Sequence, residues 1–222
     1  MRTIGLLGGM TWHSTIEYYR LVNTLANGRR GGAHSARCVI VSVDQAAIEP
    51  LMEAGRWEDA GRLLAEDAAT LERAGADVFV LACNSLHNAW ETIVAPLTIP
   101  TIHIGDATAD ALPAVGRVAL LGTRYTMEAP FLRERIEARG IDVVIPEVDD
   151  RAEIHRSIFD ELSGGVVRPE TRTWFQDLVA RLDTDAVVLG CGELGLLQLD
   201  GALVDTVRAH AQAAVDYALY DV

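Results

Sequence analysis

The chain has 222 residues, of which half are apolar and 23% are charged, so a disordered or collagen-like protein is excluded. The formal net charge of −13 argues against nucleic acid or an anionic membrane as the main partner. The apolar runs are only as long as strands, which predicts no transmembrane helix, and the first residues show no signal-peptide pattern, so we expect a cytoplasmic protein.

The complete absence of lysine limits the chemistry. All 19 basic residues are arginines. Schiff-base mechanisms on lysine, including those of pyridoxal phosphate, are therefore excluded, as is a Walker-type phosphate loop, which needs Gly-Lys. Three widely spaced cysteines argue against a disulfide framework. The six histidines lack metal-binding spacings, so we expect no metal site.

Short apolar segments alternate with helical patterns along the whole chain. The first apolar run, residues 3–7, ends at a Gly-Gly pair, and a helix is predicted over residues 15–26. Ser14 is its expected N-cap, with Glu17 completing a capping box. The next expected elements are a strand at 37–43, a helix at 57–74, a strand at 78–82, a helix at 86–94 and a strand at 101–104.

The pattern then restarts after Pro113. Its expected elements are a strand at 117–121, a helix at 126–139, a strand at 142–145, helices at 150–162 and 169–182, a strand at 186–189 and a final helix at 205–219. Strands that alternate with helices predict βαβ units and parallel sheets. Residues 4–9 resemble residues 118–123, and residues 76–83 resemble residues 184–191. The chain is therefore expected to contain two related α/β halves.

Two cysteines occupy equivalent positions of this repeat, Cys83 and Cys191, each directly after an apolar strand. Ligands of open α/β sheets bind outside the carboxyl ends of the strands. If the halves face each other across a cleft, the two sulfurs lie on opposite walls. One thiolate can then remove a proton from a carbon while the other thiol delivers one from behind, which inverts a stereocentre without a cofactor. A redox disulfide and buried structural cysteines are the alternatives.

Polar residues beside the same strand ends are candidates for substrate binding. Asn84 and Ser85 suit a carboxylate, and they also suit a simple helix cap. Glu193 can hold a substrate ammonium group or cap a helix, and Thr126 has a similar pair of interpretations. The segment 8–11 is a second candidate cradle, although it does not match the dinucleotide-binding pattern.

Other side chains receive a structural interpretation. His87, one helical turn after Cys83, is expected to cap or support that loop. Cys38 is expected in the core. Trp12, Tyr18 and Tyr19 are expected to pack rather than to form a stacking platform.

Segments around these residues resemble the aspartate/glutamate racemase family, most closely its broad-specificity amino-acid racemases. They are residues 4–23, the two cysteine motifs at 82–87 and 189–194, and residues 120–127 and 205–211. The resemblance implies an α/β fold of two pseudo-symmetric Rossmann-like domains, each with a central parallel sheet flanked by helices, and an active site in the cleft between them. The expected domains are 1–112, joined by the C-terminal helix 206–222, and 113–205.

The resemblance further implies a cofactor-independent amino-acid racemase, an isomerase that makes D-amino acids and is commonly a homodimer. Cys83 and Cys191 would be the paired acid and base. Asn84, Ser85 and the Gly192 backbone would bind the α-carboxylate, while Met10 and Thr11 would line the substrate cavity.

Three positions depart from the family pattern. Gly192 replaces a threonine, and Ile48 and Ser163 lie where aspartate-specific members carry cations for the side-chain carboxylate. A buried carboxylate without a partner is costly, so these departures argue against aspartate as the preferred substrate. The alternatives are a related carbon-acid enzyme, namely a decarboxylase, a maleate-type cis–trans isomerase or a hydantoin racemase, or else a non-catalytic small-molecule binding protein.

Overall fold

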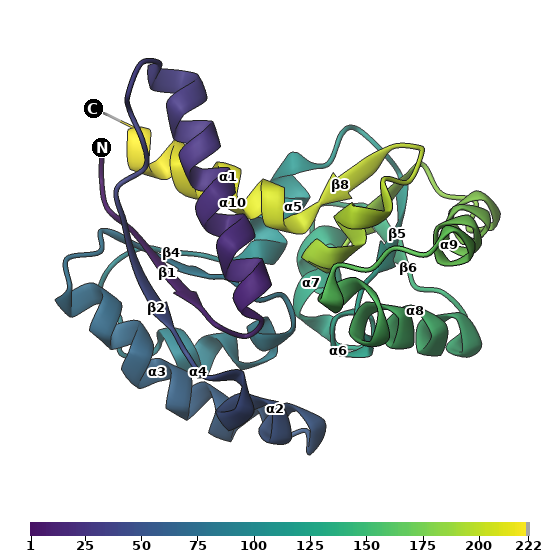
Figure 1. The fold of residues 1–222 in the computed structure, drawn as a ribbon, viewed down its shortest axis with the longest axis horizontal. Coiled ribbons are helices and arrows are strands. Elements are labelled where there is room, and N and C mark those ends of the chain that lie inside the picture. Colours follow the sequence, from purple (N-terminus) through teal and green to yellow (C-terminus); the bar gives the residue numbers. More distant parts are fainter. Residues whose placement is uncertain (221–222) are drawn as a thin grey trace. The chain divides into compact units, whose positions relative to one another are not determined.

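A computed structural model describes residues 1–220 and contains two four-stranded parallel sheets, each flanked by helices (Figure 1). The chain forms two compact units: unit 1 comprises Met1–His103 and the chain from His210 onward, and unit 2 comprises Ile104–Ala209. The predicted α/β class is therefore confirmed. The domain division predicted from the sequence stays a prediction, and residues 221–222 of the expected final helix lie outside the described residues.

The sheet of unit 1 has the strand order β2-β1-β3-β4. Its strands are β1 (Ile4–Gly8), β2 (Cys38–Ser42), β3 (Val78–Leu81) and β4 (Thr101–Ile102). Its helices are α1 (Trp12–Arg30), α2 (Gln45–Glu53), α3 (Trp57–Arg73), the 3-10 helix η1 (Ser85–Ala89) and α4 (Trp90–Val94), and α10 (Thr206–Leu219) ends in this unit. The strands β1 and β3 are wholly buried because α1 and α10 cover one face of the sheet and α3 and α4 the other (Figure 1).

Unit 2 repeats this topology with the strand order β6-β5-β7-β8. Its strands are β5 (Arg117–Leu121), β6 (Asp142–Val144), β7 (Ala186–Leu189) and β8 (Leu203–Asp205). Its helices are α5 (Ile104–Ala111), α6 (Arg124–Met127), α7 (Pro130–Glu137), α8 (Val148–Asp160), η2 (Leu162–Gly164), α9 (Pro169–Arg181) and η3 (Gly192–Leu197). The internal repeat is therefore a repeat of topology.

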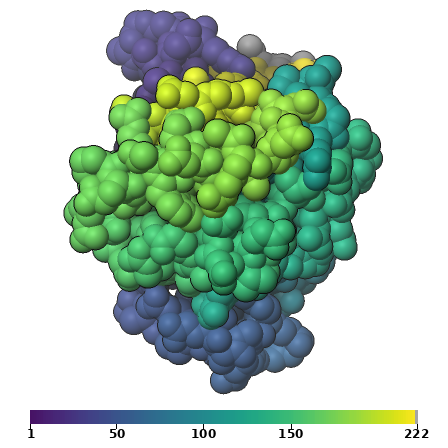
Figure 2. Space-filling model, turned by 90° about the vertical axis from the view of Figure 1, so that its right-hand side faces the viewer, coloured from purple at the N-terminus to yellow at the C-terminus, as the bar shows by residue number. Residues whose placement is uncertain are grey.

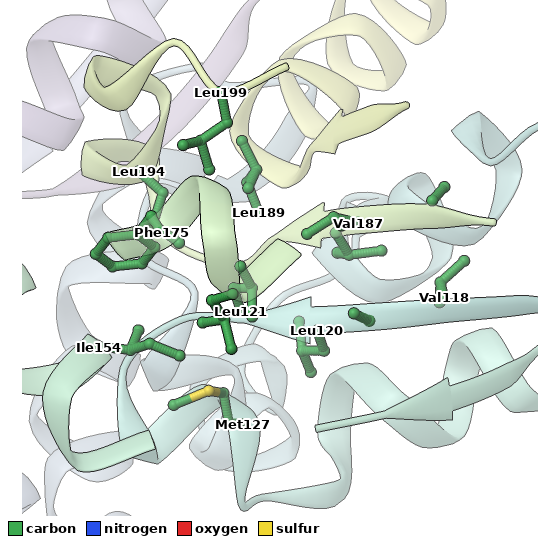
Figure 3. Packing of buried hydrophobic residues seen from close by; sticks show 14 of the residues in the cluster. Val118, Leu120, Leu121, Met127, Ile154, Phe175, Val187, Leu189, Leu194 and Leu199 are labelled. Atoms are coloured by element: carbon green, nitrogen blue, oxygen red, sulfur yellow. The ribbon is translucent and has the colours of Figure 1, made fainter. Parts of the chain in front are cut away.

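The core of unit 2 lies between its sheet and its helices. Leu121 of β5 and Leu189 of β7 belong to one buried cluster with Ile154 of α8 and Phe175 of α9, and Leu189 extends toward Leu199 (Figure 3). On the face turned to the viewer in Figure 2, the chain around residues 150–180, drawn in green, lies at the surface. Among residues 1–220, no helix is both long and apolar enough to cross a membrane.

Two expected helices begin or divide differently in the structure. The first begins at Trp12, with Thr11 rather than Ser14 as its N-cap, because Thr11 has an extended backbone and its Oγ1 accepts the Ser14 N–H at 3.3 Å. The helix expected over residues 126–139 divides into α6 and α7 before Pro130, whose ring cannot continue a helix.

Candidate active site

The first cysteine lies where two parallel strands end side by side. Leu7 of β1 pairs with Leu81 of β3, and the Ala82 N–H continues the ladder to the Leu7 carbonyl at 2.8 Å. The chain then turns, so the half-buried Cys83 thiol donates to the Met10 carbonyl at 3.7 Å. The structure thus brings together Met10 and Cys83, two candidate residues at the same sheet edge.

The turn from β1 into α1 is tied to the same edge. Its Gly9 N–H donates to Thr15 Oγ1 at 2.8 Å. Ser14 Oγ donates to the Ala82 carbonyl at 3.3 Å. Thr11, a sequence candidate, caps the helix and is partly buried at this turn. The Ser14 hydroxyl of α1 therefore holds the carbonyl of the residue that precedes Cys83.

The candidate Asn84 is the N-cap residue of the 3-10 helix η1, the candidate Ser85 is its first residue, and both are buried. His87 Nδ1 lies 2.8 Å from the Cys83 carbonyl oxygen and 3.2 Å from that of Asn84. Because a carbonyl oxygen only accepts hydrogen bonds, the imidazole is the donor to both. His87 therefore supports the cysteine loop from beneath.

The side chains of three histidines lie together beside this loop, and the sequence did not indicate this cluster. The His87 ring stacks on Trp90, with centroids 5.0 Å apart, and meets His103 edge-on at 4.7 Å. His210 of α10 lies 5.7 Å from His87 and hydrogen-bonds to Tyr18 and to the Ile102 carbonyl, both at 2.8 Å.

Burial keeps the imidazoles of His87 and His210 uncharged. It lowers the pKa of His87 well below its usual value, and electrostatic interaction with the neighbouring His103 and His210 lowers it further. Burial likewise lowers the pKa of His210 to about 4. Both side chains are therefore neutral near pH 7.

The second cysteine has the equivalent position in unit 2. Leu121 of β5 pairs with Leu189 of β7, and the Gly190 N–H donates to the Leu121 carbonyl at 2.6 Å. Cys191 follows with an extended backbone, and its thiol donates to Glu193 Oε2 at 2.8 Å. Cys191, Gly192 and Glu193 are all partly buried. The structure therefore joins two sequence candidates in one thiol–carboxylate pair.

Thr126 lies buried beneath the same strand end. Its Oγ1 is 3.4 Å from that of Thr123, a residue that sequence reasoning did not single out. A Cβ atom at Gly190 would lie 2.9 Å from the Thr126 methyl group and 3.0 Å from the Leu121 carbonyl oxygen. Glycine is thus required where the chain passes Thr126 to reach Cys191.

Two of the family departures have structural roles in this chain. Ile48 is 3% exposed and belongs to the core of unit 1. Ser163 Oγ donates to the Phe159 carbonyl at 2.7 Å, just beyond the end of α8. Neither side chain offers a charge to a ligand carboxylate.

The burial expected for three side chains, Cys38, Trp12 and Tyr19, needs correction. Cys38 is only partly buried, since β2 is an edge strand, and burial raises the pKa of its thiol to about 11. Tyr18 is buried as expected, whereas Trp12 and Tyr19 are 57% and 51% exposed on the outer face of α1.

Within residues 1–220, no group of three or more His, Cys, Asp or Glu side chains is arranged to hold a metal ion.

The sequence matches a known protein family and resembles individual members of it. A profile of the Asp/Glu/Hydantoin racemase family matches residues 7–214. The broad specificity amino-acid racemase RacX of Bacillus subtilis is 22% identical over 165 residues, which cover 69% of this chain and 70% of RacX. The glutamate racemase of Streptococcus sanguinis is 27% identical over 125 residues, 54% of this chain and 47% of that enzyme.

Solved structures share the fold over nearly the whole chain. A crystal structure from Yersinia pestis, provisionally named an Asp/Glu racemase, has 39% identity and a TM-score of 0.91, covering 99% of this chain and 100% of that one. An aspartate racemase homologue from Pyrococcus horikoshii has 28% identity and a TM-score of 0.85, covering 98% and 99%. These similarities confirm the predicted fold and the predicted class, an isomerase that works without pyridoxal phosphate: the chain belongs to the Asp/Glu/hydantoin racemase family.

Proposed function

We propose that this chain is a cofactor-independent amino-acid racemase that inverts Cα by proton transfer between Cys83 and Cys191. The observation that carries the proposal is the equivalent placement of the two thiols. Each follows the third strand of its unit, in sheets of identical strand order. The reaction needs one sulfur on each face of the same carbon, and one thiol from each of two repeat-related units suits that need.

The proposed reaction moves two protons and needs no electron acceptor. One sulfur, as thiolate, takes the Cα proton, and the electron pair left on Cα delocalises into the carboxylate. The opposite thiol then delivers its proton to the other face, so the thiol and the thiolate exchange roles. Two thiolates would repel each other, so one proton shared by the pair is the proposed resting state.

The charge that develops on the substrate carboxylate requires hydrogen-bond donors. We assign this role to Asn84, Ser85 and the backbone N–H of Gly192, because N–H groups at the start of a helix suit an anion. Glu193 is proposed to hold the substrate ammonium. A carboxylate has about four lone-pair positions, so Glu193 can accept from the Cys191 thiol at the same time.

Three further residues complete the proposed substrate cavity. Met10 and Thr11 line it at the carboxyl end of β1, where the Met10 carbonyl accepts from the Cys83 thiol. Thr126 is proposed to shape it in unit 2, beside the glycine that leads into Cys191.

The proposed substrates are amino acids of broad side-chain type rather than aspartate. The buried Ile48 and the helix-end hydrogen bond of Ser163 support this, because neither position offers a cation. The similarity to RacX, a broad specificity amino-acid racemase by name, agrees with it. A hydantoin racemase is the second candidate, since the matching family includes such enzymes and Gly192 lacks the family hydroxyl.

Incubation of an amino-acid panel in heavy water tests the proposal. We expect deuterium at Cα of at least one amino acid, with the rate reduced by about a hundredfold or more in Cys83→Ser and in Cys191→Ser. Cys38→Ser is the matched control and keeps the wild-type rate. Exchange with no amino acid, or full activity in both serine variants, would reject the two-cysteine racemase, and exchange of hydantoins alone would select the second candidate.

We also propose that the enzyme is a cytoplasmic homodimer. The mechanism needs reduced sulfurs, which a reducing compartment maintains. Trp12, Ile16 and Tyr19 lie at helical spacing on the outer face of α1 and are each more than half exposed, at 57%, 55% and 51%. A second copy of this chain is the proposed partner for this stripe. Light scattering should give twice the chain mass for the wild type, and Ile16→Glu should give the monomer.

A further inference from the structure

Two successive carbonyl groups of the loop after β3, those of Cys83 and Asn84, converge on one side chain. His87 Nδ1 donates to the Cys83 carbonyl at 2.8 Å and to the Asn84 carbonyl at 3.2 Å. The His87 backbone N–H donates to the same Asn84 oxygen at 3.0 Å. Because both oxygens can only accept, Nδ1 must carry the proton. One residue thus fixes the orientation of two successive peptide groups.

The orientation of a carbonyl determines that of the N–H group in the same peptide. No cis peptide bond occurs among the described residues, so each N–H points opposite to its C=O. The Cys83 carbonyl shares its peptide with the Asn84 N–H, and the Asn84 carbonyl with the Ser85 N–H. Holding both carbonyls on the imidazole therefore directs these two N–H groups to the opposite side of the loop.

The imidazole is itself held rigidly. It is 2% exposed, and its ring lies 9° from parallel to that of Trp90 and 74° from that of His103. Burial lowers the pKa of His87, so the ring carries a single N–H near pH 7 and the two carbonyls determine where it is.

We propose that His87 is a positioning residue, which acts through the Cys83 and Asn84 carbonyls to aim the Asn84 and Ser85 N–H groups at the substrate carboxylate. The inference rests on the proposed function, in which these groups bind that carboxylate beside the Cys83 thiol. His87 itself contacts no substrate in this mechanism.

Three substitutions separate this role from simple packing. His87→Asn keeps an N–H donor on the γ carbon, where histidine has Nδ1, His87→Gln moves the donor one bond further out, and His87→Leu removes it. The exposed His34 provides the control, His34→Leu. The probe is alkylation of Cys83 by iodoacetate and by iodoacetamide, which present the same reacting carbon with and without a carboxylate, followed by mass spectrometry of the Cys83 peptide.

We expect the ratio of the iodoacetate rate to the iodoacetamide rate to fall about tenfold in His87→Leu and His87→Gln. The ratio should stay within about twofold of wild type in His87→Asn and His34→Leu. In the racemisation assay, KM should rise in the same two variants. If His87→Leu does not fold, the comparison of the two amide variants still decides.

Two results would overturn the proposal: an unchanged ratio in both His87→Leu and His87→Gln, or an equal loss in His87→Asn. The alkylation ratio does not depend on turnover. A wild-type enzyme that racemises nothing while showing the expected ratios would therefore reject the proposed function and still support the positioning role.

Discussion

At the scale of single residues, hydrogen-bond partners determine which ring nitrogen of a buried histidine carries the proton. His210 Nε2 faces the Ile102 carbonyl, which only accepts, so Nε2 is the donor and Nδ1 accepts from the Tyr18 hydroxyl. The motif after Cys83 indicated His87 as a support. Nothing in a single sequence links His87 to His210, 123 positions later, because their contact arises only when α10 packs into unit 1.

The Cys191 thiol donates to a carboxylate, which predicts how a substitution of Glu193 changes its reactivity. A negative charge beside a thiol disfavours the thiolate. Glu193→Gln removes the charge and supplies a donor, so we expect Cys191 to react with iodoacetamide about tenfold faster at neutral pH. Mass spectrometry of the Cys191 peptide measures the rate. Glu170→Gln, at an exposed position in α9, should leave it unchanged, and a slower reaction in Glu193→Gln contradicts the prediction.

At the scale of elements, strands and long helices followed from the sequence more closely than the turns that carry the site. The buried runs of β1, β3, β5 and β7 were all expected, because strands covered on both faces are apolar throughout. The helix expected at 86–94 is a 3-10 turn followed by a short α-helix, since carbonyls at its start bond to His87 instead of continuing an α-helical ladder. Such a competition is not visible in hydrophobic periodicity.

The turn from β1 to α1 depends on a glycine. Gly9 has φ +98°, and a Cβ atom there would collide with the Val43 backbone. Gly9→Ala should therefore lower the free energy of unfolding by at least about 1–3 kcal/mol, from backbone strain alone. Gly28 provides the matched control, because it lies within α1, has no positive φ and would have no neighbour within 4 Å of its Cβ.

Gly28→Ala should instead stabilise the protein by about 0.5–1 kcal/mol, as alanine does in a helix interior. Urea denaturation of both variants measures the difference. Equal midpoints for the two variants would show that the β1–α1 turn does not require glycine.

At the scale of the whole molecule, two sheets of one topology give each thiol the same surroundings in the chain. Each cysteine follows a buried strand, and each leads into a short 3-10 helix, η1 or η3. The sequence indicated this repeat through short matches at equivalent strands. The partners of the thiols differ, with the Met10 carbonyl at Cys83 and a carboxylate at Cys191, so the repeat in topology does not extend to the chemistry.

The buried His210 makes the stability of unit 1 depend on pH. Its pKa is about 4 in the folded chain and about 6.5 when unfolded, so between these values the unfolded chain binds more protons. The neutral His210 therefore contributes about 3 kcal/mol to the free energy of unfolding, and this contribution is fully present above pH 6.5 and is lost as the pH falls toward 4.

We expect the urea midpoint to fall over this range in the wild type and to fall less steeply in His210→Leu, which has no group to protonate. The His87 imidazole should maintain part of the slope, and His34→Leu should follow the wild type. A slope that is the same in His210→Leu and the wild type would mean that protonation of His210 does not control the acid stability of unit 1.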